Sequence, residues 1–317
     1  MRIFLAGGTG VVGRRVLSLL VESGYEVSVL ARSVTNTEAV RAAGATPVSA
    51  SLFDPASLVT GFAGHDTVIN LTTHIPALSR SARASAWKEN DRIRTEGSAV
   101  IADAALKADV GRYLQEALAF TYDDHGAEWI TEEAPLFETT YTGSVKAVEA
   151  SVGRFTAGAG TGVVMRFGQF YAADASHTQS MLKSARRGWS MMPGPDDAYT
   201  VTLAADDAAS AVVAALGAPA GVYNIVDSQP LTRADWSAAM ARAVGREHLR
   251  PLPGALTKLA ATKGPNLVSS QRVSNQKFVT TTGWQPRYRS FREGILVASA
   301  GSSPPRDTSA TTAADAS

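Results

Sequence analysis

Short apolar runs alternate with amphipathic stretches along the first 170 residues. Apolar runs bounded by glycine or polar residues are typical of buried parallel strands, and they occupy residues 2–6, 25–30, 46–48, 67–71, 112–120 and 162–167. Between them, helical spacing of apolar residues predicts helices over residues 11–21, 37–43, 84–107 and 142–157. A further helix is expected to open with Asp54 as N-cap and Pro55 at its first position. The alternation predicts an α/β protein with a Rossmann-type doubly wound parallel sheet.

The pattern loosens after residue 170, which indicates a second, smaller unit. Helices are predicted over residues 180–187, 207–216 and 232–244, the last capped by Thr232, and residues 222–226 form a strand that rejoins the sheet. We assign residues 1–170 to the sheet domain, with 205–227 returning to it, and residues 171–300 mainly to a C-terminal subdomain. Residues 301–317 show no apolar periodicity and are expected to be a disordered tail.

Composition excludes several classes of protein. Of the 317 residues, 45% are hydrophobic and 19% charged, and the net charge is +1, so neither nucleic acid nor a membrane surface is an expected partner. No cysteine is present, and the 5 histidines are too scattered to suggest a metal site. With no secretory leader and no apolar run long enough for a membrane span, we expect a cytoplasmic protein. Arginine preferred over lysine, with abundant alanine, is typical of a GC-rich bacterial genome.

A glycine-rich loop follows the first predicted strand and opens the first predicted helix. Its glycines have the spacing G-x-x-G-x-x-G, in a context that favours binding of a dinucleotide phosphate at the helix N-terminus. Gly7 permits a tight turn, Gly10 lets the backbone approach a pyrophosphate, and Gly13 lets the helix pack close to the strand. The expected cofactor contacts are Gly7, Thr9, Gly10, Val11, Val12 and Gly13. The alternative is a glycine-rich turn without a ligand.

Arg32 stands just after the second predicted strand. A carboxylate at this place would bind the ribose 2′-hydroxyl of NAD, whereas a guanidinium suits the 2′-phosphate of NADP. NADP is therefore favoured, and NAD stays possible, because Arg32 could also be an ordinary solvated surface residue.

Several segments together resemble the short-chain dehydrogenase/reductase superfamily, in its extended or atypical NAD-dependent epimerase/dehydratase branch. The resemblance covers residues 1 to about 298 and rests on the glycine loop and on segments 52–55, 66–71, 164–171, 205–209 and 282–286. It implies that the C-terminal subdomain binds the substrate. It also implies further cofactor contacts from Leu52, Leu71, Thr72, Thr73 and Lys146.

The family's chemistry uses a Ser or Thr together with a Tyr-x-x-x-Lys pair, in which the Lys holds the nicotinamide ribose and the Tyr moves a proton. Lys146 fits the family Lys, but the residue four positions before it is Thr142. Tyr141 is one residue off, about 100° around a helix, and would need an irregular helix start to serve. Thr121 is the only aliphatic hydroxyl in the segment that usually carries the Ser. Arg94 stands where the family often has an Asn.

Four residues are candidates for substrate contact, each with a structural alternative. His74 follows the fourth strand, Tyr122 and His125 follow the fifth, and His177 lies in a loop of the C-terminal subdomain. The alternative for each histidine is that it is an ordinary loop residue. Asp207 is interpreted as a helix cap rather than a metal ligand.

The leading interpretation is an NAD(P)-dependent oxidoreductase or epimerase acting on a carbonyl or hydroxyl of a small organic or sugar-like substrate. The altered Tyr position leaves open a non-redox cyclase, dehydratase or isomerase on the same fold. A non-catalytic module that senses the cofactor is a third possibility, against which Lys146 argues weakly. The chain is expected to be a monomer or a homodimer.

Overall fold

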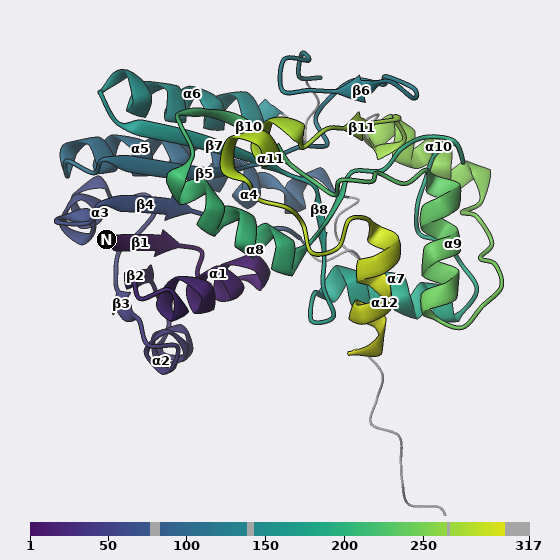
Figure 1. Cartoon of the computed structure of the whole chain (residues 1–317), viewed down its shortest axis with the longest axis horizontal. Coiled ribbons are helices and arrows are strands. Elements are labelled where there is room, and N and C mark those ends of the chain that lie inside the picture. The colour runs from purple at the N-terminus through teal and green to yellow at the C-terminus, as the bar shows by residue number, and fades with distance from the viewer. Residues whose placement is uncertain (77–82, 138–142, 265–266, 302–317) are drawn as a thin grey trace, which may run out of the picture.

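A seven-stranded parallel sheet forms the centre of the computed structural model, which describes residues 1–76, 83–137, 143–264 and 267–301 (Figure 1). Every pair of neighbouring strands in this sheet is parallel. The strands are β1 (Arg2–Ala6), β2 (Glu26–Leu30), β3 (Thr46–Val48), β4 (Thr67–Asn70), β5 (Arg112–Leu118), β7 (Thr161–Phe167) and β10 (Gly221–Ile225). Their order is β10-β7-β5-β4-β1-β2-β3. The predicted doubly wound parallel sheet is confirmed.

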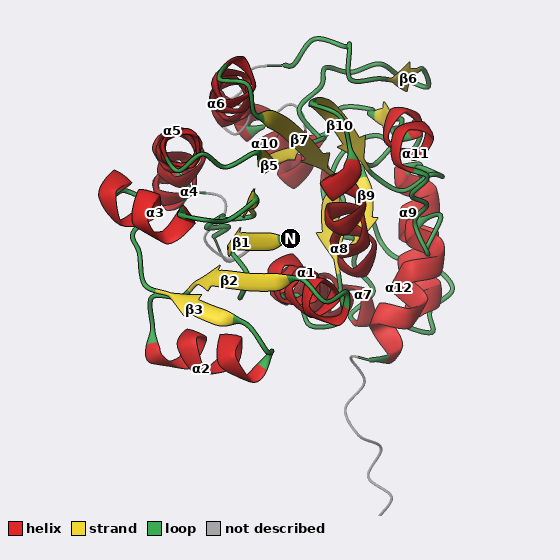
Figure 2. Cartoon of the chain, turned by 60° about the vertical axis from the view of Figure 1, so that its left-hand side comes forward, coloured by secondary structure: helices red, strands yellow, loops and turns green. Residues whose placement is uncertain are grey.

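Helices cover both faces of this sheet (Figure 2). They are α1 (Val11–Glu22), α2 (Val34–Ala42), α3 (Pro55–Phe62), α5 (Ser98–Lys107), α6 (Gly143–Ala157) and α8 (Ala205–Ala214). Alternate residues of β1 enter two separate cores: Ile3 packs in the core of α1 and α8, and Phe4 in the core of α3, α5 and α6. This two-residue period explains why the strands read as continuous apolar runs, since both of their faces are buried.

The segment predicted as one helix over 84–107 is instead divided into four pieces. A 3₁₀ turn (η1, Ala84–Ala86) leads to α4 (Lys88–Arg92), a π turn (η2, Ile93–Gly97) and then α5. The π turn contains Arg94, which is almost completely buried. Helical periodicity alone does not reveal such a turn, because the apolar pattern continues through it. π turns occur frequently at functional sites.

Two predicted caps are confirmed and one is wrong. Asp54 accepts a hydrogen bond from the Ala56 N–H at 3.1 Å. Thr232 accepts one from Asp235 at 3.2 Å. Asp207 does not cap α8, because that helix begins after Ala204. Its carboxylate instead accepts backbone hydrogen bonds from residues 287 and 288, at 2.7 and 3.1 Å.

A second lobe packs beside the carboxyl edge of the sheet, on the right of Figure 1. It contains α7 (Ser176–Arg186), α9 (Arg233–Ala243), α10 (Gly254–Lys263) and α12 (Phe291–Ala300). Its own core includes Trp236 stacked on Phe291, with ring centroids 4.8 Å apart. Two small sheets lie beside it: β8 (Gln169–Tyr171) with β9 (Thr202–Ala204), and β6 (Trp129–Ile130) with β11 (Arg272–Val273). A 3₁₀ turn (η3, Ala215–Gly217) follows α8, and α11 (Gln276–Thr282) packs on β10.

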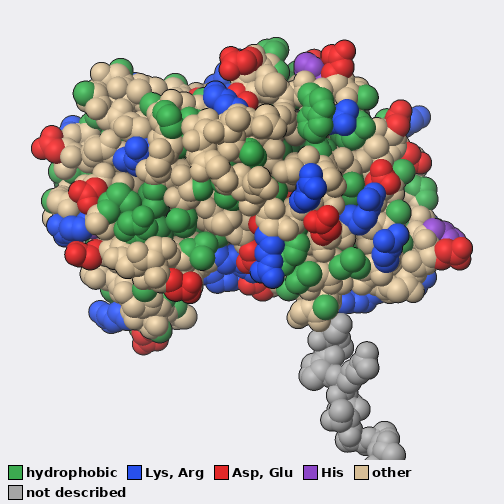
Figure 3. Space-filling view, viewed as in Figure 1, with side chains coloured by type: hydrophobic (Ala, Val, Ile, Leu, Met, Phe, Trp, Pro, Cys, Tyr) green, Lys and Arg blue, Asp and Glu red, His purple; other side chains and the backbone are tan. Residues whose placement is uncertain are grey.

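Two surface properties bear on possible partners. Lys and Arg side chains are interspersed with Asp and Glu on the face shown in Figure 3, without a broad patch of one sign. Within the described ranges, no helix combines the length and apolar character that crossing a bilayer requires.

Candidate functional site

The sheet has a topological switch point between β1 and β4. From β1 the chain proceeds to β2 and β3 on one side, and later to β4, β5, β7 and β10 on the other. Ligands of open α/β sheets bind outside the carboxyl ends of the strands at such a point. The candidate site is therefore the edge where β1 and β4 end.

The glycine loop lies at this edge and owes its shape to two of its glycines. Gly7 has φ +86°, and a Cβ there would lie only 2.7 Å from the Leu71 carbonyl group. A Cβ on Gly13 would lie 1.9 Å from the Gly7 carbonyl oxygen. The Gly10 N–H donates to that same oxygen at 3.1 Å. The loop therefore holds the N-terminus of α1 against the ends of β1 and β4.

Gly10 leaves that helix end uncovered. It is the N-cap of α1, no side chain caps the helix, and its first turn contains no acidic residue. A Cβ on Gly10 would meet nothing closer than the Gly7 oxygen at 3.4 Å. Uncapped N–H groups and the positive end of the helix dipole favour an anion. The residues present therefore fit the pyrophosphate of a dinucleotide.

The other predicted cofactor contacts lie around the same edge. Thr9 is exposed at the loop, and Val11 and Val12 form the first turn of α1. Arg32 follows β2 with an exposed side chain, and among the described residues its guanidinium forms no ion pair. Leu52 is buried beyond β3, whereas Leu71, Thr72 and Thr73 continue from β4 at half-buried or exposed positions.

The structure describes two of the four predicted catalytic residues, Lys146 and Thr121. Lys146 lies in the first turn of α6 with an exposed side chain. Tyr141 and Thr142 lie outside the described residues. Thr121 is fully buried, and its hydroxyl donates to the Leu118 carbonyl at 3.1 Å. The Thr121 hydroxyl is thus engaged with the backbone at the end of β5.

A buried ion pair lies at the carboxyl end of β5. The Arg94 guanidinium contacts the Glu116 carboxylate at 2.5 Å, and both side chains are almost completely buried. Burial raises the pKa of Glu116. The sequence shows that an arginine replaces the family's usual Asn at position 94. It does not show that Glu116, 22 residues away, is the partner of this arginine, because no local pattern connects the two. The pair joins the π turn to the sheet beside the predicted catalytic segment.

The three histidines predicted to contact substrate each have a different hydrogen-bond partner. The His74 backbone N–H donates to Asn90 at 3.1 Å. The backbone of His125 donates to the Ser270 carbonyl, also at 3.1 Å, and a ring nitrogen of His177 contacts the backbone of residue 170. Among the described residues, no group of three or more His, Asp or Glu side chains is arranged to hold a metal ion.

Tyr122 differs from these histidines because it lies in the interior. Its hydroxyl donates to the Asn224 side chain at 2.7 Å and accepts from the Arg166 guanidinium at 2.6 Å. Arg166 also pairs with Glu149 of α6 at 2.7 Å. Burial raises the pKa of Tyr122. The residue therefore links strands β7 and β10 within a polar network, and its hydroxyl contacts protein groups.

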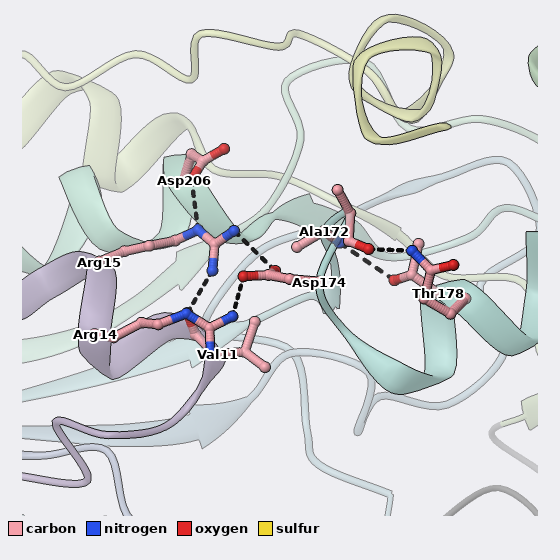
Figure 4. Close-up of polar contacts among 9 residues, drawn as sticks. Val11, Arg14, Arg15, Ala172, Asp174, Thr178 and Asp206 are labelled. Atoms are coloured by element: carbon pink, nitrogen blue, oxygen red, sulfur yellow. Dashed lines mark hydrogen bonds and ion pairs between the residues drawn. The ribbon is translucent and has the colours of Figure 1, made fainter. Parts of the chain in front are cut away.

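Two arginines of α1 connect this helix to the rest of the chain (Figure 4). Arg15 pairs with Asp206 of α8 at 2.5 Å and with Asp174 at 2.9 Å. Arg14 also pairs with Asp174, which lies in the loop before α7. A third bond from Arg15 reaches the Val11 carbonyl at 2.8 Å. The helix that follows the glycine loop is thus tied to the segment leading into the second lobe.

Comparison with known proteins assigns the chain to a family. A family model described as NAD(P)H-binding matches residues 7–152. A Streptomyces protein, 3-diazoavenalumate denitrifying reductase, is 30% identical over 308 residues, which cover 93% of this chain and 99% of that one. The chain therefore belongs to the NAD(P)-binding epimerase and reductase family of the short-chain dehydrogenase/reductase superfamily.

Solved structures show the same fold. A human epimerase family protein with NADPH has a TM-score of 0.76 and 21% identity, covering 95% of this chain and 99% of that one. The Thermus thermophilus UDP-glucose 4-epimerase in complex with NAD has a TM-score of 0.74 and 19% identity, with coverages of 95% and 98%. At this level of identity the likeness shows a shared fold and nothing further.

Proposed function

We propose that the protein is an NADPH-dependent reductase that transfers hydride to a small electrophilic substrate. The uncovered N-terminus of α1 behind Gly10 supports the proposal most directly, because it fits a dinucleotide pyrophosphate. Bound NADPH would supply the hydride. A relative named as a reductase that aligns with 93% of this chain favours reduction over a non-redox reaction or cofactor sensing.

The choice of NADP over NAD rests on Arg32. Its exposed guanidinium follows β2, at the position where the family's dinucleotides present the adenosine ribose. A guanidinium there donates charge-assisted hydrogen bonds to a 2′-phosphate, for which NAD has no counterpart.

The altered Tyr-x-x-x-Lys pair suits a substrate whose reduction consumes no proton. Reduction of a carbonyl needs a proton as well as a hydride, and Thr142 cannot supply that proton as a phenol would. Replacement of a diazonium group needs a hydride alone. The ring carbon accepts the hydride, a hydrogen together with its two electrons. The carbon–nitrogen bond breaks, and dinitrogen leaves with the two electrons of that bond. The named substrate of the Streptomyces relative is a diazo compound. We therefore assign the chain to arenediazonium cations or similarly activated electrophiles, the protonated form of a diazo phenol included, with Lys146 holding the nicotinamide ribose.

The test uses the full chain, 4-methoxybenzenediazonium as substrate and NADPH carrying deuterium at both C4 positions. We expect enzyme-dependent release of dinitrogen and one deuterium at the ring carbon that bore nitrogen, measured by mass spectrometry. The same reaction in heavy water with unlabelled NADPH should give unlabelled product. A product that takes its hydrogen from solvent, or a rate equal to that without enzyme, would refute the proposal.

Variants separate the roles of the catalytic segment. Lys146→Ala should lower cofactor affinity and turnover together, whereas the exposed Lys107→Ala on α5 is the matched control and should leave both unchanged. Thr142→Tyr restores the family spacing and should raise reduction of benzaldehyde relative to the diazonium. Tyr141→Phe should keep full activity. A large loss there with intact NADPH binding would instead identify Tyr141 as the proton donor and contradict the proton-free assignment.

A further inference from the structure

A cleft opens where the carboxyl edge of the sheet meets the second lobe. Two of its residues follow strands of the central sheet: Phe120 comes after β5, and Gln169 begins β8 just after β7. The cleft is open and shallow: its empty space, much of it continuous with solvent, totals about 300 Å³, and only about 20 Å³ of it is enclosed enough to count as cavity. Its remaining lining comes mostly from the second lobe and its loops: Met192, Tyr199, Thr200, Val201, Arg233, Leu267, Ser269 and Gln271. The place matches the crevice where ligands of α/β sheets bind.

Arg233 is the charged residue in this lining. It is the first residue of α9, and only 4% of its surface is exposed to solvent. One terminal nitrogen, Nη2, donates to the carbonyl oxygens of Leu267 at 3.1 Å and Ser269 at 2.9 Å. The other two nitrogens, Nε and Nη1, have no hydrogen-bond partner among the described residues. Three N–H donors of a buried cation are thus unused, an arrangement that costs free energy unless a ligand or water accepts them.

Among the residues that the structure describes, the charge of Arg233 also has no adjacent counter-ion. Burial lowers the pKa of its guanidinium to about 10, so the group is a cation at neutral pH. Asp124 and Asp197 act on it electrostatically, but in the described part of the chain neither lies within ion-pair distance. Both oxygens of Asp124 already accept backbone hydrogen bonds, one from Gly126 and one from Ser270, each at 2.9 Å. The site therefore holds a buried positive charge with unused donors, beside a cleft of mixed polar and apolar lining that includes the rings of Phe120 and Tyr199.

We propose that Arg233 binds an anionic group of the substrate, a carboxylate in particular, with the flat apolar part of that molecule against Phe120 and Tyr199. The identity of the ligand as the substrate rests on the proposed reductase function, whereas the anion site stands on the geometry of the cleft. Carboxylate oxygens accept guanidinium hydrogen bonds that are charge-assisted and stronger than neutral ones. Gly194 (φ +105°) packs against the guanidinium, and a Cβ there would lie 2.9 Å from Cζ, so this glycine gives the Arg233 side chain room.

The test compares 2-naphthoate with its uncharged methyl ester on the full-length protein in the presence of NADP⁺, by calorimetry or ligand-observed NMR. We expect the wild type to bind the acid at least tenfold more tightly than the ester. Arg233→Met should abolish this preference while leaving ester affinity within about twofold. Arg242→Met is the matched control, because Arg242 lies on the same helix with an exposed side chain, and it should retain the preference.

Several outcomes would overturn the assignment: equal binding of acid and ester by the wild type, an acid preference that survives in Arg233→Met, or the same loss in Arg242→Met. Because Arg233 also holds residues 267 and 269, its removal could unfold the lobe. In that case Arg233→Lys, which keeps the charge, should fold and retain part of the preference, and loss of all preference would refute the site. NADP⁺ affinity is measured separately. Failure to bind NADP⁺ alongside an intact acid preference would refute the reductase and leave the anion site standing.

Discussion

Gly10→Asp should remove cofactor binding without harming the fold. Gly10 is the N-cap of α1, and a Cβ there meets only the Gly7 oxygen at 3.4 Å, an ordinary contact. Aspartate is among the favoured N-cap residues, and glycine is only a few tenths of a kcal/mol worse. The free energy of unfolding of the protein without cofactor should therefore stay the same or rise slightly.

The new carboxylate would occupy the helix end that a pyrophosphate needs. Two unit charges about 4 Å apart repel by about 4 kcal/mol at an effective dielectric constant of about 20. At about 1.4 kcal/mol per factor of ten, this repulsion weakens NADPH binding by about a thousandfold. Loss of the helix N–H donors to the new cap would add to the effect.

Gly10→Asn is the matched control, because it has the same shape and capping ability without the charge. Titration of NADPH by nicotinamide fluorescence should show a much smaller loss for Asn than for Asp, and thermal melts should show both variants folded. Equal affinities in the Asp and Asn variants would refute the electrostatic reasoning. A wild-type Kd in Gly10→Asp would refute the placement of the pyrophosphate altogether.

Gly13 offers a contrasting perturbation in the same loop. A Cβ at Gly13 would lie 1.9 Å from the Gly7 carbonyl oxygen, so even Gly13→Ala must push α1 away from β1. Overpacking of this kind typically costs about 1–3 kcal/mol. Urea unfolding should show that loss in the absence of cofactor, which separates a structural glycine from one that leaves room for a ligand. A Gly13→Ala protein as stable as the wild type would contradict it.

Three further predictions follow from named contacts. Arg32→Ala should weaken NADP binding by about 1–3 kcal/mol, the cost of losing a hydrogen bond to a charged group, with NAD affinity unchanged in parallel titrations; equal losses would refute the 2′-phosphate contact. Glu116→Gln leaves the buried Arg94 charge without its counter-ion and should lower the free energy of unfolding in urea by about 3–5 kcal/mol. Glu96→Gln, which breaks the exposed pair with Arg92, should change that free energy little. Burial lowers the pKa of His65 in the folded protein. Its contribution to the free energy of unfolding is therefore complete above the ordinary histidine pKa of roughly 6.5, and it is lost as pH falls from there through the lower folded pKa. His65→Gln should flatten the dependence of stability on pH below about pH 7, and an unchanged slope would contradict this.

Local pattern alone predicted the alternation of strands and helices, the parallel sheet they form and the position of the glycine loop. Strand runs could be predicted because both faces of a parallel sheet are buried, so each strand is apolar along its whole length. The caps at Asp54 and Thr232 could be predicted because a capping bond spans only two or three residues. The glycine loop could be predicted because its turn at Gly7, the helix N-cap at Gly10 and the helix contact at Gly13 all lie within seven residues.

Contacts between distant segments were decided only by the tertiary structure. The Arg94–Glu116 pair joins residues 22 apart, and the π turn that carries Arg94 leaves no mark in the apolar pattern. Asp207 reads as a cap in the sequence, yet it binds a backbone segment 80 residues away. The buried donors of Arg233 become apparent only when α9 folds against residues 267–269, because an arginine beside a helix cap is ordinarily solvated. Sequence periodicity records which face of an element is buried, but a polar side chain's partner depends on how those elements are packed together.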